Sequence, residues 1–299
     1  MSAGRVPDAY LARIRHAFPE RSRARFELID EGAVNDVVIV DGELVCRFPK
    51  RDVPEEGVER EGRALALVAR HVRAPVPRYE VVDSGFAAYQ RLAGGSLTRD
   101  RLRALAPADR AAVLRDLVTF LAELHAVPAE EAETVGVGAS PTVRDRPWWL
   151  AFLERVRERV APYLVAHQRD WLERWFEPVL SGELLFDDAP RLVHGDLAPD
   201  HLLVEASAPR LSGVLDFGTA GLGDPAVDLA ALLYHYGESL VAPVLVDAPD
   251  LTACLPRARF WAGTLELQWA LAALERGDRG LGVAHIGSAR DLGHPSARG

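Results

Sequence analysis

The sequence predicts an α+β fold in two lobes, a small N-terminal lobe built on an antiparallel sheet and a larger lobe that is mainly helical. Short apolar runs separated by turn residues fill most of the first 92 positions, with one helical stretch among them. The glycine-containing segment 93–95 is a flexible junction, and from Thr98 onward apolar residues recur at helical spacing. We therefore expect the lobes to span residues 1–93 and 94–299.

The N-terminal lobe is expected to open with a helix near residues 10–18, because Pro7 and Asp8 suit a helix start. Strands are expected to follow at 25–30, 37–40 and 43–48. Asp41-Gly42 between two apolar runs is typical of a tight hairpin. The turn around Asn35 is the candidate nucleotide loop, but it lacks the repeated glycines of phosphate-cradling loops, so by itself it fits an ordinary hairpin turn.

One cation stands out in the third of these strands. Leu44, Cys46 and Phe48 share one face of the strand, and Arg47 points to the other. A solvated strand cation is the plain interpretation of Arg47, yet its place in an apolar run favours a functional one. A helix at 55–71 and two strands at 79–82 and 86–92 complete the lobe.

The larger lobe is expected to be helical. His125, at the end of the first long helix, is interpreted as a cap or packing residue. The tail from about 280 is rich in Gly and Arg without periodicity, so we expect it to be frayed. The expected helices cover residues 110–126, 147–165, 170–180, 227–236 and 251–274.

Two motifs in this lobe carry chemistry. The first is a loop after a short apolar strand, which presents Asp196 and, five positions later, His201. The second is Asp216-Phe217-Gly218, which follows another apolar run. Kinases use this arrangement: one carboxylate receives the substrate hydroxyl proton, while a ligand five residues on and the second Asp hold magnesium on the phosphates.

These motifs resemble those of the aminoglycoside phosphotransferase family, small-molecule kinases whose fold is similar to that of protein kinases. The likeness covers roughly residues 26–278 and rests on His194-Gly195-Asp196-Leu197 and Asp216-Phe217-Gly218. The family usually has Asn where this chain has His201. The 2''-phosphotransferase branch also carries His there, in runs similar to Asp200-His201-Leu202-Leu203, and is the nearest match.

The resemblance implies a role for each motif residue. Asp196 would be the catalytic base, and His201 and Asp216 would bind Mg²⁺, although imidazole is a softer donor than magnesium prefers. Arg47 stands where the family has a phosphate-contacting Lys, and Glu61 would be its partner. Asp228 would support the catalytic loop through hydrogen bonds.

The resemblance also implies where the nucleotide base and the acceptor bind. Tyr89 would gate the base pocket of ATP or GTP, and the backbone of Gln90, Arg91 and Ala93 would form the hinge that meets the base. The resemblance implies a small, cationic hydroxyl compound as the acceptor, such as an aminoglycoside; a macrolide, a sugar or an amino alcohol remains an alternative. Candidate acceptor contacts are Glu238, Glu266 and Trp269.

Composition narrows the partners. The formal net charge of −9 argues against general nucleic-acid binding, and no long apolar window suggests a membrane span. The N-terminus does not resemble an export signal, and Cys46 and Cys254 suit reduced thiols, so a cytoplasmic location is expected. Either a monomer or a homodimer fits the sequence.

Two rival interpretations remain at this point. His194, Asp196 and His201 could be ligands of a hydrolytic metal site, although Asp216, Arg47 and Glu61 would then have no role. Alternatively, the departures at Arg47 and His201 could mark a catalytically weak nucleotide-binding module.

Overall fold

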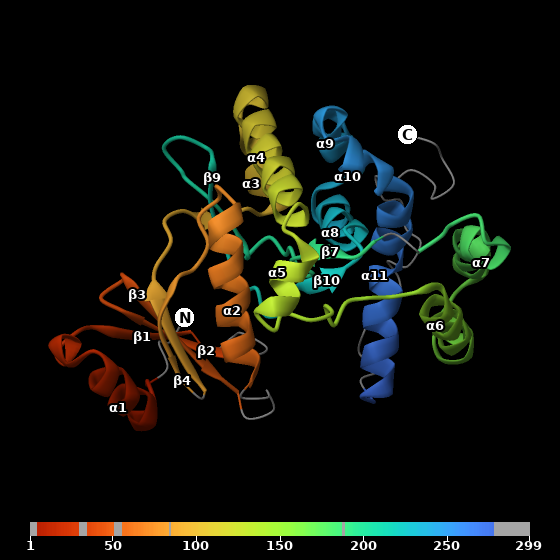
Figure 1. The fold of residues 1–299 in the computed structure, drawn as a ribbon. Coiled ribbons are helices and arrows are strands. Elements are labelled where there is room, and N and C mark those ends of the chain that lie inside the picture. The colour runs from red at the N-terminus through yellow and green to blue at the C-terminus, as the bar shows by residue number, and fades with distance from the viewer. Residues whose placement is uncertain (1–4, 30–34, 51–55, 84, 187–188, 278–299) are drawn as a thin grey trace.

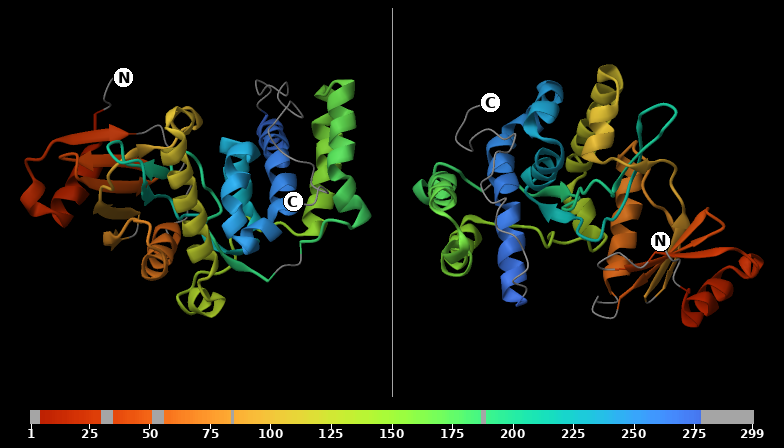
Figure 2. Two further views of the ribbon diagram at one scale, coloured as in Figure 1. Left: turned by 90° about the horizontal axis from the view of Figure 1, so that it is seen from above. Right: turned by 180° about the vertical axis from the view of Figure 1, so that it is seen from behind.

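The computed structural model describes residues 5–29, 35–50, 56–83, 85–186 and 189–277, and it has the two-lobe α+β fold expected from the sequence (Figure 1). Figure 2 shows from two further directions that the sheet and α1 lie at one end of the molecule and α6 and α7 at the other. Most of the candidate nucleotide loop, at 30–34, and the tail expected to be frayed lie outside the described residues.

The N-terminal sheet has five strands in the order β1-β2-β3-β5-β4, and each neighbouring pair is antiparallel. The hairpin predicted at Asp41-Gly42 is confirmed, because both residues have positive φ (53° and 76°), as a two-residue turn of this kind requires. The strands are β1 (Phe26–Ile29), β2 (Asn35–Val40), β3 (Leu44–Pro49), β4 (Tyr79–Asp83) and β5 (Phe86–Gln90).

One face of this sheet packs in a hydrophobic cluster of its own. Helix α1 (Asp8–Ala17) covers the face of Leu44, Cys46 and Phe48, and Tyr10 stacks on Phe48 with ring centroids 4.0 Å apart. Helix α2 (Glu56–His71) lies between the sheet and the helices of the larger lobe (Figure 1). Its buried residues pack in the core of the larger lobe. The helix that carries Glu61 is therefore anchored on both sides of the junction.

The larger lobe contains the helices predicted from periodicity, with two corrections. The helix expected at 147–165 ends earlier: α6 stops at Arg159 and is followed by a 3₁₀ turn that contains Pro162, and α7 begins at Ala166, before the expected 170. Proline lacks the amide that a continuing helix needs. The stretch 251–274 is divided at Cys254, ahead of Pro256.

The described helices of this lobe, with their bounds, are α3 (Arg99–Ala104), α4 (Pro107–His125), α5 (Ala129–Thr134), α6 (Arg146–Arg159), α7 (Ala166–Ser181), α8 (Ala226–Tyr236), α9 (Glu238–Val241), α10 (Pro249–Ala253) and α11 (Leu255–Glu275). Short 3₁₀ turns are η1 (Pro19–Arg21), η2 (Ala161–Tyr163) and η3 (Ala242–Asp247). Trp149 of α6 is fully buried at the centre of their aromatic contacts, and α8 packs along α11.

Small strands position the two motifs. The loop that holds Asp196 and His201 connects β7 (Arg191–Val193) to β8 (Leu202–Val204). Asp216 follows β9 (Leu211–Val214), which pairs with β8, so the two motifs emerge side by side. The remaining strands are β6 (Gly95–Ser96), which pairs with β8, and β10 (Gly221–Gly223), which pairs with β7.

No single helix in the described part of the chain is long and apolar enough to cross a membrane. Only α8 taken together with the segment Glu238–Asp247 meets the length and composition criterion, and these two pieces are bent by 109°.

Candidate active site

The loop between β7 and β8 presents Asp196 to solvent. The side chain of Asp196 is 56% exposed and lies 3.8 Å from His201 Nδ1. Gly195 before it has φ 83°, and a Cβ there would come within 3.1 Å of the Thr219 carbonyl oxygen. Glycine therefore meets two demands at once: the left-handed backbone and the close approach of the segment that follows Asp216.

A buried carboxylate holds this loop by its backbone. Asp228 is fully buried and accepts hydrogen bonds from His194 N (3.0 Å), Gly195 N (2.8 Å) and His125 Nε2 (2.9 Å). Burial alone would raise the pKa of Asp228. The hydrogen bond and charge of His125, together with the loop amide of Gly195, lower the pKa by more than that, so the net shift is downward. The predicted support of the loop by Asp228 is confirmed. The sequence indicated a cap or packing role for His125, and the hydrogen bond between His125 and Asp228 was not predicted.

His194 has no ring nitrogen left for a metal ion. Its Nε2 lies 2.9 Å from the Leu215 carbonyl oxygen and so donates, while its Nδ1 accepts from Asp196 N at 3.2 Å. Burial lowers the pKa of His194, in agreement with a neutral ring. Among the described residues there is also no group of three His, Cys, Asp or Glu that could hold a metal. The hydrolytic metal site is therefore not formed.

His201 and Asp216 face each other as a pair of ligands would. His201 Nδ1 lies 2.7 Å from the Asp196 carbonyl oxygen, which can only accept, so in the neutral ring the lone pair is on Nε2. That atom is 3.6 Å from Asp216 Oδ2. A magnesium site commonly uses one or two protein ligands and completes its shell with phosphate oxygens and water, so this donor pair fits a divalent cation.

Asp216 has an unusual backbone conformation. Its φ is 60°, which is costly for a residue with a side chain, and its Oδ1 accepts from Gly218 N at 3.3 Å. Burial raises the pKa of Asp216, but the charges of Arg47 and His201 lower it by more, so the carboxylate is ionised. The strained turn thus keeps a charged carboxylate directed toward His201.

The ion pair expected between Arg47 and Glu61 is present and buried. Arg47 Nη1 lies 2.6 Å from Glu61 Oε1 and 2.8 Å from the Tyr79 hydroxyl oxygen, and Nη2 lies 3.7 Å from Asp216 Oδ1. Burial lowers the pKa of Arg47, but the negative charge of Glu61 raises it well above its usual value, so the guanidinium stays charged. Tyr79 is a member of the site that sequence reasoning missed.

Helix α2 also contacts the segment after Asp216 directly. Glu61 Oε1 accepts from Phe217 N at 3.1 Å. One residue earlier, Arg60 donates to the carbonyl oxygens of Ala220 (2.6 Å) and Gly218 (3.2 Å). Adjacent residues of one helix therefore bind both an amide and carbonyls of the same loop, and only Glu61 was identified from the sequence.

The proposed hinge is partly occupied by internal bonds. Arg91 N donates to the Glu43 carbonyl oxygen at 2.6 Å, and Ser212 Oγ donates to the Ala93 carbonyl oxygen at 2.8 Å. Gln90 Nε2 donates to Glu80 at 2.9 Å. A base bound along this segment would therefore have to use its remaining backbone groups. A cavity of about 430 Å³ lies against residues 90–94.

Tyr89 lies on β5 next to the charged cluster. It is buried, and its ring stacks on that of Tyr79 with centroids 5.7 Å apart. Burial raises the pKa of Tyr89 to about 12, so the phenol is neutral. Asn35 is the first residue of β2, opposite Pro49, and its neighbour Asp36 lies 3.6 Å from Lys50 Nζ.

The expected acceptor residues are not equivalent. Glu238 is half-buried and forms an ion pair through both carboxylate oxygens, with Arg259 Nε 3.0 Å from Oε1 and 3.1 Å from Oε2. Trp269 is half exposed and meets Tyr234 edge to face at 5.2 Å. Glu266, one turn before Trp269 on α11, is half-buried. A cationic acceptor would find Glu238 already neutralised by Arg259.

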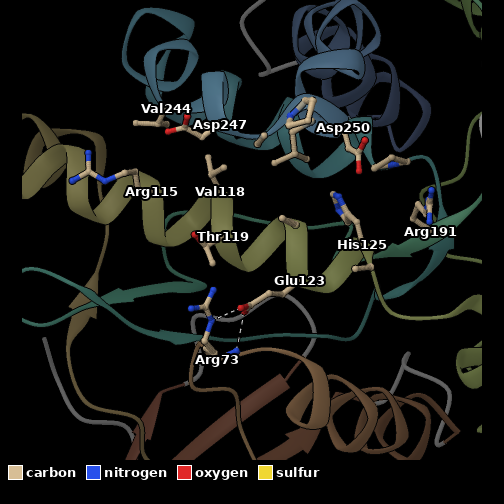
Figure 3. Close-up of a pocket in the computed structure, with 16 residues that line it drawn as sticks. Arg73, Arg115, Val118, Thr119, Glu123, His125, Arg191, Val244, Asp247 and Asp250 are labelled. Carbon is tan, nitrogen blue, oxygen red and sulfur yellow. Dashed lines mark hydrogen bonds and ion pairs between the residues drawn. The ribbon is translucent and has the colours of Figure 1, made fainter.

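A larger cavity of about 650 Å³ lies away from these residues (Figure 3). Its walls come from α4 and from the segment that carries Val244, Asp247 and Asp250. None of the residues expected to bind nucleotide, metal or acceptor lines it. His125 does line this cavity, so the cavity wall includes the residue that hydrogen-bonds to Asp228.

Comparison with known sequences points to one family. The sequence model of APH, the phosphotransferase enzyme family, matches residues 25–261. Viomycin phosphotransferase of Streptomyces vinaceus is 33% identical over 262 residues, which cover 84% of this chain and 88% of that protein.

Solved structures give the same result at the level of fold. The GDP and kanamycin complex of an aminoglycoside 2''-phosphotransferase superposes with a TM-score of 0.80 at 28% identity, covering 91% of this chain and 94% of the other. A macrolide 2'-phosphotransferase from Brachybacterium faecium gives a TM-score of 0.67 at 25% identity, covering 95% and 99%.

Proposed function

The chain belongs to the APH phosphotransferase enzyme family, and from this premise we propose that it transfers the γ-phosphate of ATP or GTP to a hydroxyl group of an antibiotic of the aminoglycoside type. The observation that supports this best is the arrangement around Asp196. An exposed carboxylate stands beside the facing pair of His201 and Asp216, with Arg47 at 3.7 Å from Asp216. Phosphoryl transfer asks mainly for such positioning and charge neutralisation.

Each of these residues has a chemical task in the proposed reaction. Asp196 accepts the proton of the acceptor hydroxyl or orients that hydroxyl for attack. Arg47, kept charged by Glu61, binds phosphate oxygens. His201 and Asp216 would hold Mg²⁺, which when bound neutralises charge on the phosphates. Asp228 holds the backbone of the loop, so that Asp196 is presented with its side chain exposed to solvent.

The acceptor is proposed to be cationic, with aminoglycosides first and viomycin next. The related proteins favour both, since one acts on viomycin by name and another is a kanamycin complex. On the expected acceptor side, Glu238 is neutralised by its ion pair with Arg259, while the Trp269 side chain is half exposed and offers its ring to a cation. Such a site suits an acceptor with few ammonium groups.

A panel of acceptors tests this proposal. The purified protein is given nucleotide and Mg²⁺ with kanamycin, viomycin, a macrolide, a simple sugar and an amino alcohol, and nucleoside diphosphate release is measured together with the mass of the acceptor. Phosphorylation of kanamycin or viomycin is expected, and Asp196→Ala is the control that removes it. Turnover confined to the macrolide, sugar or amino alcohol would replace the proposed acceptor class.

For the nucleotide, we propose that GTP is used at least as well as ATP. Tyr89 is bulky, buried and stacked on Tyr79, so it narrows the back of the base pocket and favours a base shifted along the hinge. Steady-state kinetics with both nucleotides, on the wild type and on Tyr89→Ala, provide the test. A kcat/KM for ATP well above that for GTP, and unchanged in Tyr89→Ala, would contradict this assignment.

A further inference from the structure

We propose that Tyr79 is a positioning residue for the nucleotide: its hydroxyl fixes the plane of the Arg47 guanidinium and so directs the remaining donors of Arg47 toward the phosphates. The inference rests on the proposed function, because it takes Arg47 to be a phosphate ligand. It concerns what this chain needs in order to use an arginine where related proteins carry a lysine.

The geometry of Nη1 carries the argument. Arg47 Nη1 has two N–H bonds, and the structure gives it two acceptors, Glu61 Oε1 at 2.6 Å and the Tyr79 oxygen at 2.8 Å. Both N–H bonds of a guanidinium nitrogen lie in the guanidinium plane. One acceptor would leave the group free to turn about that contact, whereas two acceptors in different directions define the plane. Nη2 and Nε then point in fixed directions.

Tyr79 also lies close to the carboxylate of the cluster. Burial and the nearby charge of Glu61 raise the pKa of the Tyr79 phenol, so it stays neutral and its oxygen accepts from Arg47. Glu61 Oε1 further accepts from Phe217 N at 3.1 Å. Arg47 thus joins Tyr79 and Glu61 into one cluster, which Glu61 attaches to the loop that carries Asp216. Removing the hydroxyl leaves one N–H of Arg47 Nη1 without its acceptor in a largely enclosed place.

The ring of Tyr79 is contacted by two other elements. Tyr89 of β5 stacks on it, at 5.7 Å between centroids. Gly62 of α2 also lies against it, where an added Cβ would be 3.3 Å from Tyr79 Cδ2. A glycine inside a helix is less favourable than alanine by about 1 kcal/mol, so its presence next to Glu61 fits a requirement for close approach of this ring. The hydroxyl is therefore placed as firmly as the carboxylate.

A lysine in place of Arg47 would not need this contact. Its ammonium is a compact charge with three donors that rotate about one bond, and a single carboxylate is enough to place it. The proposal therefore predicts coupling: loss of the Tyr79 hydroxyl should matter when residue 47 is Arg and should matter little when it is Lys.

The test is a double-mutant cycle of wild type, Tyr79→Phe, Arg47→Lys and Arg47→Lys/Tyr79→Phe. Direct nucleotide binding is measured by displacement of a fluorescent ATP or GTP analogue, and kcat and KM are measured with the best acceptor. Tyr79→Phe is expected to raise the nucleotide Kd and KM about tenfold, the scale of a hydrogen bond to a charged group, with a smaller change in kcat. In the Arg47→Lys background the same change is expected to be about twofold or less.

Two further variants separate positioning from general packing. Tyr10→Phe removes another hydroxyl bonded to a carboxylate in the same lobe, Asp36 at 2.8 Å, and is expected to leave nucleotide binding unchanged. Gly62→Ala keeps the hydroxyl but pushes the ring, and it should raise the nucleotide KM only with Arg at position 47. Thermal midpoints of all variants show whether each one is folded.

The outcomes distinguish the possible failures. An equal rise in KM in both backgrounds would reduce Tyr79 to a packing residue, and no rise in the Arg47 background would overturn the proposal outright. If Tyr79→Phe does not fold, the Gly62→Ala pair decides by the same comparison. If the wild type binds neither fluorescent nucleotide, the proposed function fails, and that result is visible before any variant is compared.

Discussion

The two charged regions of the site are held in opposite ways. Asp196 is more than half exposed, and its place is fixed by a buried carboxylate, Asp228, that binds the backbone before it. Arg47 is only 8% exposed, and its place is fixed by other side chains, Glu61 and Tyr79, from two further elements. The carboxylate proposed to act on a variable acceptor is left open, while the cation proposed to bind the phosphates is enclosed.

This difference predicts how each region fails. A change at Asp196 removes a chemical group and should leave the fold intact, because the side chain is more than half exposed and lies 3.8 Å from its ion-pair partner His201. A change behind it, at Asp228, removes an acceptor for three buried donors and so affects folding as well as catalysis. The predictions below use that contrast, from the largest expected effect to the smallest.

The largest effect is expected from Asp196→Ala. General-base contributions are commonly about 10²–10⁴-fold, so kcat should fall by that order while the nucleotide Kd and the thermal midpoint stay close to wild type. Asp200→Ala, an exposed carboxylate on the same loop, is the matched control and should keep its rate. Retention of most of the wild-type kcat in Asp196→Ala would remove Asp196 from the chemistry.

Asp228→Ala is expected to lower the free energy of unfolding by about 3–5 kcal/mol, because three buried donors lose their acceptor. Denaturant unfolding measures the loss. Its dependence on pH follows from the lowered pKa of Asp228: the stabilisation is complete above the unfolded value of 3.8 and is lost as pH falls through the lower folded value. If unfolding is measured between about pH 5 and 8, the difference in free energy of unfolding between wild type and Asp228→Ala should be constant, and it should shrink only in strong acid.

The metal pair gives a smaller effect. His201→Asn is expected to keep magnesium-dependent activity, since an amide oxygen suits Mg²⁺, whereas His201→Ala should raise the magnesium concentration needed for half-maximal rate about tenfold. Imidazole favours Mn²⁺ over Mg²⁺ more than an amide does, so the wild type should prefer Mn²⁺ more strongly than His201→Asn. Identical magnesium titrations for His201→Ala and wild type would show that His201 is not a ligand.

The contrast also explains what could be read from the sequence. Loop motifs name Asp196, His201 and Asp216 by spacing alone, and strand alternation places Arg47 on the face toward α2. Turn chemistry identifies the Asp41-Gly42 hairpin. Where one local rule decides the outcome, the expectation agrees with the structure.

Side-chain contacts between residues far apart in the sequence could not be predicted in the same way. Tyr79 reaches Arg47 because the pairing of β4 with β5 shifts between Tyr79 and Val81, so simple alternation along β4 does not say which way its ring points. His125 finds Asp228 across 103 positions of sequence. The end of α6 was placed too late, at residue 165 instead of Arg159, because apolar spacing continues through Pro162 and only the proline marks the end.

The smallest effect is expected where the two regions are joined. Arg60 donates from α2 to the carbonyl oxygens of Ala220 and Gly218, which follow Asp216. It therefore adds a second link between α2 and this loop, next to the bond between Glu61 and Phe217 N. Its side chain is only partly enclosed, and each bond is to a neutral carbonyl, so Arg60→Met should lower the free energy of unfolding by about 1 kcal/mol and kcat by less than tenfold.

Arg63→Met, one turn along the same helix, is the control. Denaturant unfolding and kcat at saturating nucleotide measure both. A decrease in the free energy of unfolding as large as that of Asp228→Ala would mean that the lobes are joined mainly through Arg60. The exposed and the enclosed parts of the site would then belong to one rigid unit and would not fail separately.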